Sequence, residues 1–279
     1  MRLKRFLSII YSLAGLWAVA QTVTQTVQIG DTFMQRGEYV SAYKYYQRAS
    51  FFAGKEQIPG LYGKMGDASF MAGKYDEAIG HYNKAQGLEQ NDSLRTEWML
   101  KKVTSLAFRG RYKMALLEML TYRGRFTPDQ QKAAYYLKGL CYFGQNQFDR
   151  AKQNLLRAVP AGDSIRRQQI ERLFSKKNLY RPNPKTAKWL SVFVPGLGQL
   201  YAGDLKNAAN SFILNGLLAY LLIRDSVTYS FWDGFVGIFP WLQRYYTGGY
   251  QRAEKIARKK RKEKRGRVFQ KIHTIIFAP

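Results

Sequence analysis

The chain has 279 residues, enough for two modest domains that each bury a core of ordinary size. Its formal net charge is +26, from 45 Lys and Arg against 19 Asp and Glu, and such an excess attracts nucleic acid or an anionic lipid surface. The lone Cys141 excludes an internal disulfide and a CxxC pair, and neither His81 nor His273 has a second ligand at metal spacing, so we expect no metal and no cofactor.

The first twenty residues are typical of an export signal. A basic start precedes an apolar run from Phe6 to Trp17, and Ala18-Val19-Ala20 then forms a cleavage site. The run is shorter than the roughly 20 residues that a bilayer span needs. We therefore expect residues 1–20 to be a signal peptide, and the alternative is an uncleaved signal anchor. In both cases the following chain begins on the far side of the membrane.

Four segments repeat without gaps in the next part of the chain. They begin at Gly37, Gly73, Gly110 and Asn146, so successive start points differ by 36, 37 and 36 residues. The segments read GEYVSAYKYYQRA, GKYDEAIGHYNKA, GRYKMALLEMLTY and NQFDRAKQNLLRA. A fixed period of this length indicates stacked helix pairs rather than one compact core.

Each segment has the pattern of a helix that follows a tight turn. It starts with Gly or Asn, the residue types best suited to a left-handed helix end. Small and large residues then recur at i, i+4 and i+7, which is one face of an amphipathic helix. The small residues are Ala42, Ala78, Ala115 and Ala151, the large ones are Tyr46, Tyr82, Met119 and Leu155, and the preceding helix carries Gly30, Gly66, Val103 and Gly139.

This pattern resembles the tetratricopeptide repeat over residues 23–177, about half of the chain. The resemblance implies an all-α fold in which a helical solenoid of about four repeats occupies residues 21–180. The third copy departs from the pattern, because Val103 replaces a small residue and Tyr122 replaces an alanine, so we expect its packing to be displaced. Residues 163–177 have apolar residues on one face and are expected to form the helix that caps the stack.

In the tetratricopeptide family, the first helix of each pair lines a concave groove that takes a peptide or a partner protein. Carried over to this sequence, the groove-lining residues are Asp31, Met34, Asp67, Phe70, Met71, Phe108, Tyr136 and Phe143. The lining is mostly apolar and aromatic, so we expect an apolar or aromatic-rich protein or peptide ligand. The alternative is that several of these residues only pack between neighbouring repeats.

The composition changes after Asn183. We expect a linker over residues 181–188 and a domain of short membrane helices over residues 189–250, with apolar stretches near 187–202, 206–223 and 229–246. The block PGLGQLYAG resembles the motif at the first turn of the two-transmembrane-helix domain family, which reads PGLGQxYxG in similar bacterial membrane domains. The residues that carry this resemblance are Pro195, Gly196, Gly198, Gln199, Tyr201 and Gly203.

The residue types in this motif have a physical reading. Glycines let helix backbones touch, and Gln199 in an apolar context is expected to hydrogen-bond a neighbouring helix. A nucleotide-binding loop is the other interpretation, but the Lys-Ser or Lys-Thr that follows GxxxxG is missing. Runs of 12 to 16 apolar residues also suit buried core helices, which is the alternative to a membrane domain.

Residues 251–279 form a basic tail. From Arg252 to Arg267 there are ten Lys or Arg against two Glu. The pattern favours contact with anionic lipid headgroups on the cytoplasmic side, and a nucleic-acid arm is the less favoured alternative. A second basic cluster, from Arg166 to Lys188, argues against that orientation. The expected headgroup contacts are Arg258, Lys259, Lys260, Arg261 and Lys262.

No catalytic constellation is present. Asp31 and Asp67 occupy equivalent repeat positions and could act as an acid–base pair, but repeat symmetry explains them more simply. We therefore expect not an enzyme but a membrane-anchored scaffold that assists assembly or insertion of envelope proteins, at the bacterial inner membrane with the repeats on the periplasmic side. The alternatives are a channel or transporter component with Asp233 on its pathway, or recognition of cell-wall glycan by Tyr-rich faces.

Overall fold

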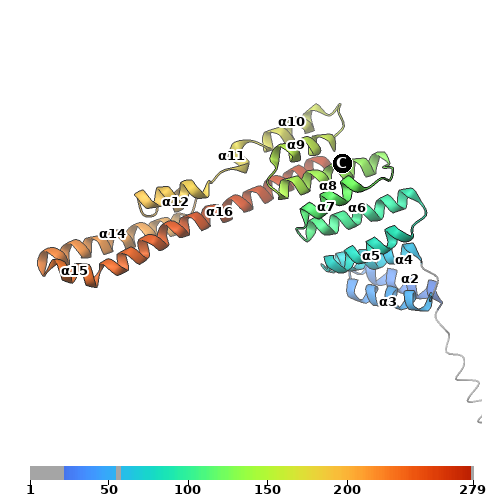
Figure 1. Cartoon of the computed structure of the whole chain (residues 1–279), viewed down its shortest axis with the longest axis horizontal. Coiled ribbons are helices and arrows are strands. Elements are labelled where there is room, and N and C mark those ends of the chain that lie inside the picture. Colours follow the sequence, from blue (N-terminus) through green and yellow to red (C-terminus); the bar gives the residue numbers. More distant parts are fainter. Residues whose placement is uncertain (1–21, 55–57, 278–279) are drawn as a thin grey trace, which may run out of the picture. The chain divides into compact units, whose positions relative to one another are not determined.

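The computed structural model describes residues 22–54 and 58–277, so the expected signal peptide at residues 1–20 lies outside the described residues. Within these ranges every regular element is a helix, which agrees with the all-α prediction. The chain divides into two compact units between Ala161 and Gly162. The units are described separately below, with the labels of Figure 1.

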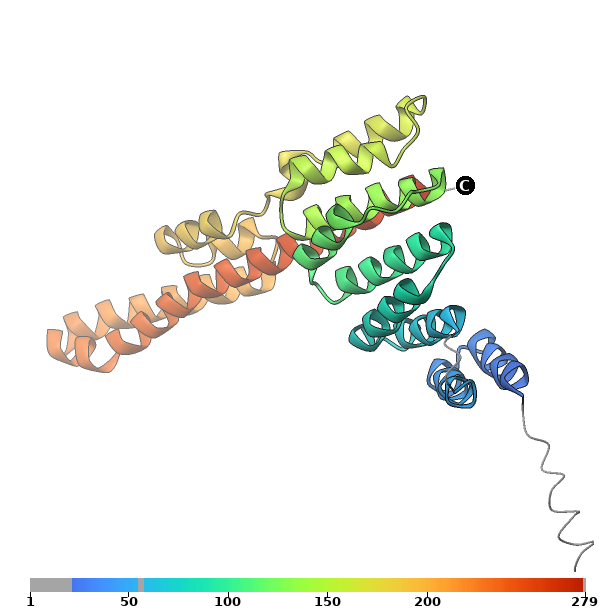
Figure 2. The same ribbon diagram turned by 45° about the vertical axis from the view of Figure 1, so that its right-hand side comes forward.

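The N-terminal unit consists of helical hairpins that follow one another along the chain (Figures 1 and 2). Each helix packs against its chain neighbours, as stacked repeats do. The helices are α2 (Val23–Gln35), α3 (Tyr39–Phe52), α4 (Pro59–Met71), α5 (Tyr75–Leu88), α6 (Asp92–Phe108), α7 (Tyr112–Thr121), α8 (Pro128–Gly144) and α9 (Phe148–Arg157).

The turn inside each hairpin has the left-handed residue that the sequence predicts. Gly37, Gly73 and Gly110 have φ between +76° and +79°, and Asn146 has φ +61°. In every hairpin the amide that follows this residue donates back to a carbonyl in the last turn of the first helix, as Glu38 does to Phe33. The repeated bond ends each first helix and sends the chain into the second.

The predicted stripe of small and large residues is the core of each hairpin. Ala42, Ala78, Ala115 and Ala151 are fully buried, and the large residues that follow them are at most 4% exposed. A Cβ at Gly30 or Gly66 would collide with the ring of Tyr46 or Tyr82, which lies flat on the glycine. The expected close approach of paired helices is therefore confirmed.

The third hairpin accommodates both of its departures from the pattern. Val103 is fully buried in the same cluster as Met119, whose side chain stands where the first two copies have a flat tyrosine ring. A flexible thioether can fill the space beside a larger neighbour, so the valine is packed normally. The packing of this copy is therefore not displaced at Val103. The copy departs from the first two at the end of its second helix, where Tyr122 is extended.

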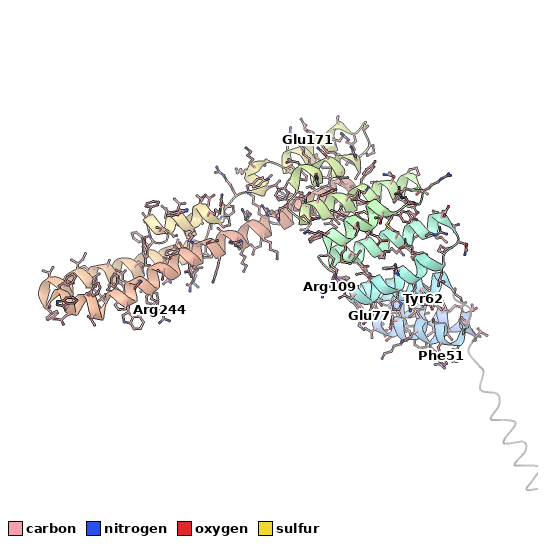
Figure 3. The ribbon with its side chains drawn as sticks, in the orientation of Figure 1. Phe51, Tyr62, Glu77, Arg109, Glu171 and Arg244 are labelled. Carbon is pink, nitrogen blue, oxygen red and sulfur yellow. The ribbon has the colours of Figure 1, made fainter. Side chains whose placement is uncertain are left out.

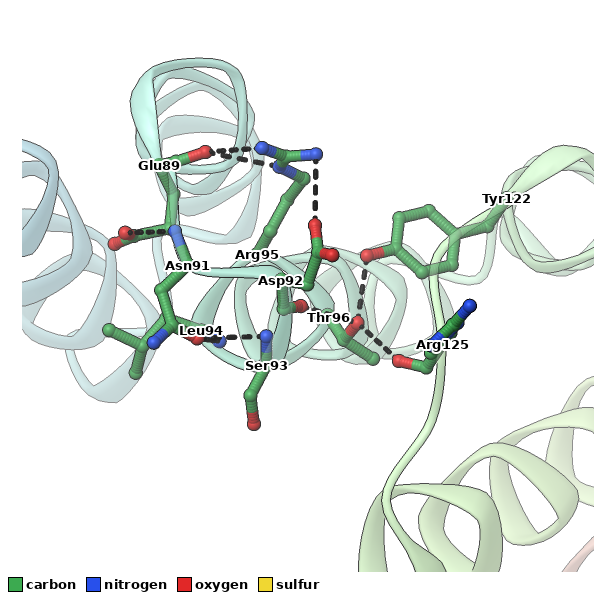
Figure 4. Close-up of polar contacts among 9 residues, drawn as sticks. All are labelled: Glu89, Asn91, Asp92, Ser93, Leu94, Arg95, Thr96, Tyr122 and Arg125. Carbon is green, nitrogen blue, oxygen red and sulfur yellow. Dashed lines mark hydrogen bonds and ion pairs between the residues drawn. The ribbon is translucent and has the colours of Figure 1, made fainter.

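Helix α7 ends at Thr121, and Tyr122 begins an extended segment. Its hydroxyl lies 2.8 Å from Thr96 Oγ1 of α6, which also contacts the carbonyl oxygens of Asp92 and Arg125 (Figure 4). A threonine has one hydroxyl proton, so Thr96 donates toward the two carbonyls and Tyr122 donates to Thr96. Tyr122 thus fixes the connection to α8 through its hydrogen bond with Thr96.

Cys141 lies in the core between the third and fourth hairpins and is fully buried. Burial raises the pKa of its thiol from the ordinary 9.0 to about 12. An unfolded chain therefore loses this proton near pH 9 while the folded chain keeps it, and the thiol's contribution to stability falls as pH rises from 9 toward 12.

We expect the free energy of unfolding to decrease by at most about 1.4 kcal/mol per pH unit in that window because of Cys141. Urea unfolding at pH 8, 9 and 10 measures the decrease, and Cys141→Ala is the control that removes this part of the slope. If the free energy of unfolding falls equally steeply with pH in Cys141→Ala, the thiol has the same pKa in the folded and the unfolded chain.

The C-terminal unit is also helical. Its helices are α10 (Ser164–Leu173), α11 (Lys176–Leu179), α12 (Pro184–Phe193), α13 (Leu197–Tyr201), α14 (Leu205–Thr228), α15 (Phe231–Gly237) and α16 (Phe239–Phe277). Helix α16 has 39 residues, and α10 to α15 all pack along it. The basic segment at 251–279 is therefore not a separate tail as predicted, but the continuation of a helix that starts in the apolar region.

Two further boundaries differ from the sequence-based prediction. The expected capping segment at 163–177 forms α10 and the start of α11, which pack against α16 within the C-terminal unit. The predicted linker at 181–188 is mostly helical, because Asn183 caps the N-terminus of α12 by accepting from the Lys185 amide. Pro184 at the first helical position suits this start.

The first predicted membrane stretch, at 187–202, is not one helix. Val194 is extended, Pro195 has no amide hydrogen, and Gly196 has φ +93°, so α12 and α13 form a short hairpin. Among the described helices, none combines the length and the apolar character that crossing a bilayer requires. The prediction of membrane-spanning helices at 189–250 is therefore not supported by the structure.

Candidate interaction surfaces

Two of the predicted groove residues belong to a polar ladder between successive hairpins. Asp31 accepts a hydrogen bond from the Tyr46 hydroxyl at 2.7 Å and pairs with Lys64 of the next hairpin. Asp67 does the same with Tyr82, at 2.7 Å, and with Lys101, at 3.0 Å. Each carboxylate therefore joins one hairpin to the next, and this bonding explains both aspartates without acid–base chemistry.

Burial and the neighbouring aspartate together raise the pKa of both tyrosines, so each hydroxyl remains a donor. The ladder stops after two rungs. Where the third and fourth copies replace the tyrosine by Met119 and Leu155, the positions equivalent to the aspartates hold Thr104 and Leu140. The tyrosine and the aspartate are therefore present together or absent together in each copy. This pairing is a signal in the sequence that could have identified the ladder.

An aromatic cluster forms at one end of the second and third hairpins. The rings of Phe70, Tyr75 and Phe108 meet with centroid distances of 5.2 to 5.6 Å. Phe108 is 59% exposed and the adjacent predicted residue Met71 is 52% exposed, while Phe70 is half-buried beneath them. Phe70, Met71, Tyr75 and Phe108 are named the aromatic patch below. Three of them, Phe70, Met71 and Phe108, are predicted groove residues, and Tyr75 is added by the structure.

The remaining predicted groove residues lie deeper. Met34 packs on the core of the first hairpin, and Tyr136 packs on the core shared by the third and fourth hairpins, where burial raises its pKa to about 12. Phe143 is 8% exposed, and its ring contacts Phe148. For these three residues the structure favours the alternative interpretation, packing within and between repeats.

The PGLGQ motif of the C-terminal unit is a tightly packed corner. Gln199 is fully buried; its Oε1 accepts from Ser191 of α12 at 2.8 Å, and its Nε2 donates to the Gly249 carbonyl of α16 at 3.0 Å. The expected hydrogen bond from Gln199 to a neighbouring helix is therefore confirmed. Ser191 in turn accepts from the Gly198 amide. The Gln199 side chain therefore joins three segments, α13, α12 and α16.

The glycines of the motif permit this approach. A Cβ at Gly198 would overlap the Ala187 carbonyl oxygen, and a Cβ at Gly196 would overlap that of Ala208. Gly203 has φ +78° and ends α13, and the Tyr201 hydroxyl accepts from the Asn183 amide. The motif therefore brings α12, α13, α14 and α16 together, which a nucleotide-binding loop would not do.

The basic residues predicted to contact lipid lie on the long helix α16. Arg258 pairs with Glu254 one turn earlier, and Lys259, Lys260 and Lys262 are exposed. Arg261 is half-buried. Hydrogen bonds from the side chain and amide of Asn207 lower the pKa of Asp204 at the start of α14, and the charge of Lys260 adds a smaller lowering. Farther along, Lys264 and Arg265 donate to carbonyl oxygens of α11 and so have a structural role.

The C-terminal unit also exposes much apolar surface. On α14 the exposed residues recur at helical spacing along one face, and α12 and α15 add aromatic rings. Each of the following is at least half exposed: Trp189, Phe193, Phe212, Ile213, Leu217, Tyr220, Ile223, Val227, Phe231, Trp232 and Val236. These residues are named the apolar face below. Contiguous apolar surface on this scale marks a binding region for a protein or a membrane.

The fold and these surfaces define an all-helical protein with tetratricopeptide-like hairpins. In agreement, the family model described as tetratricopeptide repeat matches residues 133–159, the second part of α8 together with α9. In the matched hairpin, Gly139, Ala151 and Leu155 occupy the positions of the small and large residues that recur in the other copies. A comparison with curated proteins found no significant match.

Proposed function

We propose that this protein is a membrane-anchored protein–protein interaction scaffold of the bacterial envelope. The repeat stack carries the proposal, because tetratricopeptide repeats commonly bind proteins or peptides and are generally non-catalytic. The aromatic patch supplies the docking surface, and its exposed Met71 and Phe108 favour an apolar or aromatic-rich segment. The role that fits a scaffold at this place is help in assembling or inserting envelope proteins, with the repeats on the periplasmic side of the inner membrane.

Selection of a random peptide library on the full-length chain tests the docking surface. We expect enriched peptides rich in aromatic and large apolar residues. Met71→Ser with Phe108→Ser should weaken their binding by about 2 kcal/mol or more, because both apolar contacts are lost. The matched control is Leu117→Ser with Leu120→Ser, two residues of α7 that are 62% and 64% exposed. Equal loss in both variants would contradict the patch as the docking site.

The C-terminal unit supports the anchoring part of the proposal by its apolar face and by the basic residues on α16. The apolar side chains suit the acyl boundary of a bilayer, and the cations suit anionic headgroups. Each Lys or Arg near an anionic surface contributes about 1 kcal/mol. A channel or transporter receives less support, because Asp233 is exposed at the start of α15.

Flotation of the full-length chain with vesicles of phosphatidylethanolamine and phosphatidylglycerol tests this anchoring. We expect the protein to float, and we expect changing Arg258, Lys259, Lys260 and Lys262 to Gln to weaken binding about a hundredfold or more, since four cations are removed. Binding of the variant should also fall less steeply than that of the wild type as salt is added. Wild-type protein that stays at the bottom of the gradient would overturn the attachment and leave the docking proposal standing.

A further inference from the structure

A polar cavity lies between α14 and α16, beside the buried Gln199 of α13. Its volume is about 290 Å³. Asn207, Asn210, Ser211 and Asn215 line it from α14. This wall is amide-rich and carries no carboxylate, whereas the neighbouring surface of α14 is apolar.

Two side-chain oxygen atoms of this wall are buried without a hydrogen-bond partner among the described residues. Ser211 is 9% exposed and Asn215 is 3% exposed, and among the described residues nothing hydrogen-bonds Ser211 Oγ or Asn215 Oδ1. The orientation of the Asn215 amide is set, since its Nδ2 donates to the Ser211 carbonyl at 2.7 Å. Its Oδ1 therefore faces a donor from solvent or from a bound molecule rather than from the protein. An unsatisfied buried group of this kind costs about 1–3 kcal/mol, so it calls for a ligand that supplies the missing bond.

The opposite wall is cationic. Arg244 and Arg252 line the cavity from α16, and Figure 3 labels Arg244 on that helix. Within the described chain neither arginine forms an ion pair. They lie eight residues apart, a rise of about 12 Å, so long side chains from two turns can reach one group between them. Guanidinium groups favour oxyanions with several acceptor oxygens, phosphate above all.

We propose that this cavity binds a phosphate ester that carries a hydrogen-bond donor, a hydroxyl or an ammonium group, next to the phosphate. Arg244 and Arg252 bind the phosphate oxygens. Asn215 Oδ1 accepts from the donor, and Ser211 can bond either part. Glycerophosphate lipid headgroups and soluble phosphate esters share this chemistry. The site is separate from the headgroup contacts at residues 258–262, and soluble esters can occupy it whether or not the chain attaches to a membrane.

Isothermal titration calorimetry of the full-length chain tests the cavity with sn-glycerol 3-phosphate, phosphoethanolamine and inorganic phosphate. We expect both esters to bind more tightly than inorganic phosphate. Arg244→Gln and Arg252→Gln should each weaken the esters at least about tenfold, because a charged hydrogen bond is lost. Asn215→Leu should remove the preference for the esters over inorganic phosphate. Arg267→Gln, an exposed residue of the same helix outside the cavity, is the control and should bind normally.

A vesicle assay identifies the source of the ester. If the natural ligand is a lipid headgroup, Arg244→Gln reduces binding to phosphatidylglycerol vesicles; if it is a soluble ester, calorimetry changes and vesicle binding does not. Both results support the cavity, provided that thermal melts show the variants to be folded. Unchanged affinity for the esters in both arginine variants, or no binding of any of the three probes by the wild type, would overturn it.

Discussion

Gly198→Ala is expected to destabilise the C-terminal unit by about 3 kcal/mol, although alanine is the better helix former. The added methyl group would overlap the Ala187 carbonyl oxygen, which belongs to the backbone of α12 and cannot rotate away. It would also push against Ser191, which accepts from the Gly198 amide and donates to Gln199. The two helices have to separate, and the buried bonds of Gln199 are lost with them.

Differential scanning calorimetry of the full-length chain measures this effect, and we expect the melting temperature of the affected unit to fall by roughly 10 °C. Gly216→Ala is the matched control. Gly216 lies within α14, and no atom lies within 4 Å of a Cβ placed there. This variant should be neutral or up to about 1 kcal/mol more stable, from helix propensity alone. An equal fall in melting temperature in both glycine variants would show that Gly198 of α13 does not lie against Ala187 of α12.

Trp98→Ala is expected to cost about 3–5 kcal/mol and to uncouple the first two hairpins from the last two. Trp98 is 8% exposed on α6, and its ring covers Gly63 of α4, where a Cβ would collide with it. The ring also stacks on Tyr82 at 6.4 Å, and the Lys101 ammonium lies 4.8 Å from its centroid. This one side chain of the third hairpin therefore contacts both helices of the second hairpin, at Gly63 and at Tyr82.

Urea unfolding followed by circular dichroism measures this loss. Stability in a stack of repeats depends on contacts between neighbours, so we expect one cooperative transition to broaden or divide in two. Phe51→Ala is the control, because Phe51 is an aromatic residue of the same unit that is 81% exposed (Figure 3). A sharp, nearly unshifted transition in Trp98→Ala would mean that the hairpins are joined by other contacts.

The repeats could be recognised from the amino-acid sequence. Glycine or asparagine at the turn, alanine at the contact and a large residue four positions on are local requirements, and they recur at a constant period. Each requirement acts within about 20 residues of chain, so reading the residues in order was enough. The bonding of Gln199 was predictable for a similar reason, because a buried amide needs partners wherever the chain places it.

Which of these residues face solvent depends on how the helices pack, and the sequence did not show it. Phe70, Phe108 and Phe143 have the same aromatic character in the sequence, but Phe108 is 59% exposed and Phe143 is 8% exposed. Exposure depends on how completely the neighbouring side chains cover each ring. Phe148 of the same hairpin packs on Phe143, whereas Phe108 stays largely exposed although its ring contacts Phe70 and Tyr75. The groove lining carried over from the repeat family was therefore partly core.

In the C-terminal unit, too, the arrangement of the helices could not be predicted from the sequence. Apolar stretches were visible in the sequence, but an apolar run does not reveal whether a helix breaks within it or continues beyond it. Pro195 and Gly196 divide the first run, while α16 passes from apolar to basic residues without a break. The polar cavity arises because residues about 30 positions apart, such as Asn215 and Arg244, meet across α14 and α16. Pairing of distant helices depends on packing over their whole length, which no local pattern records.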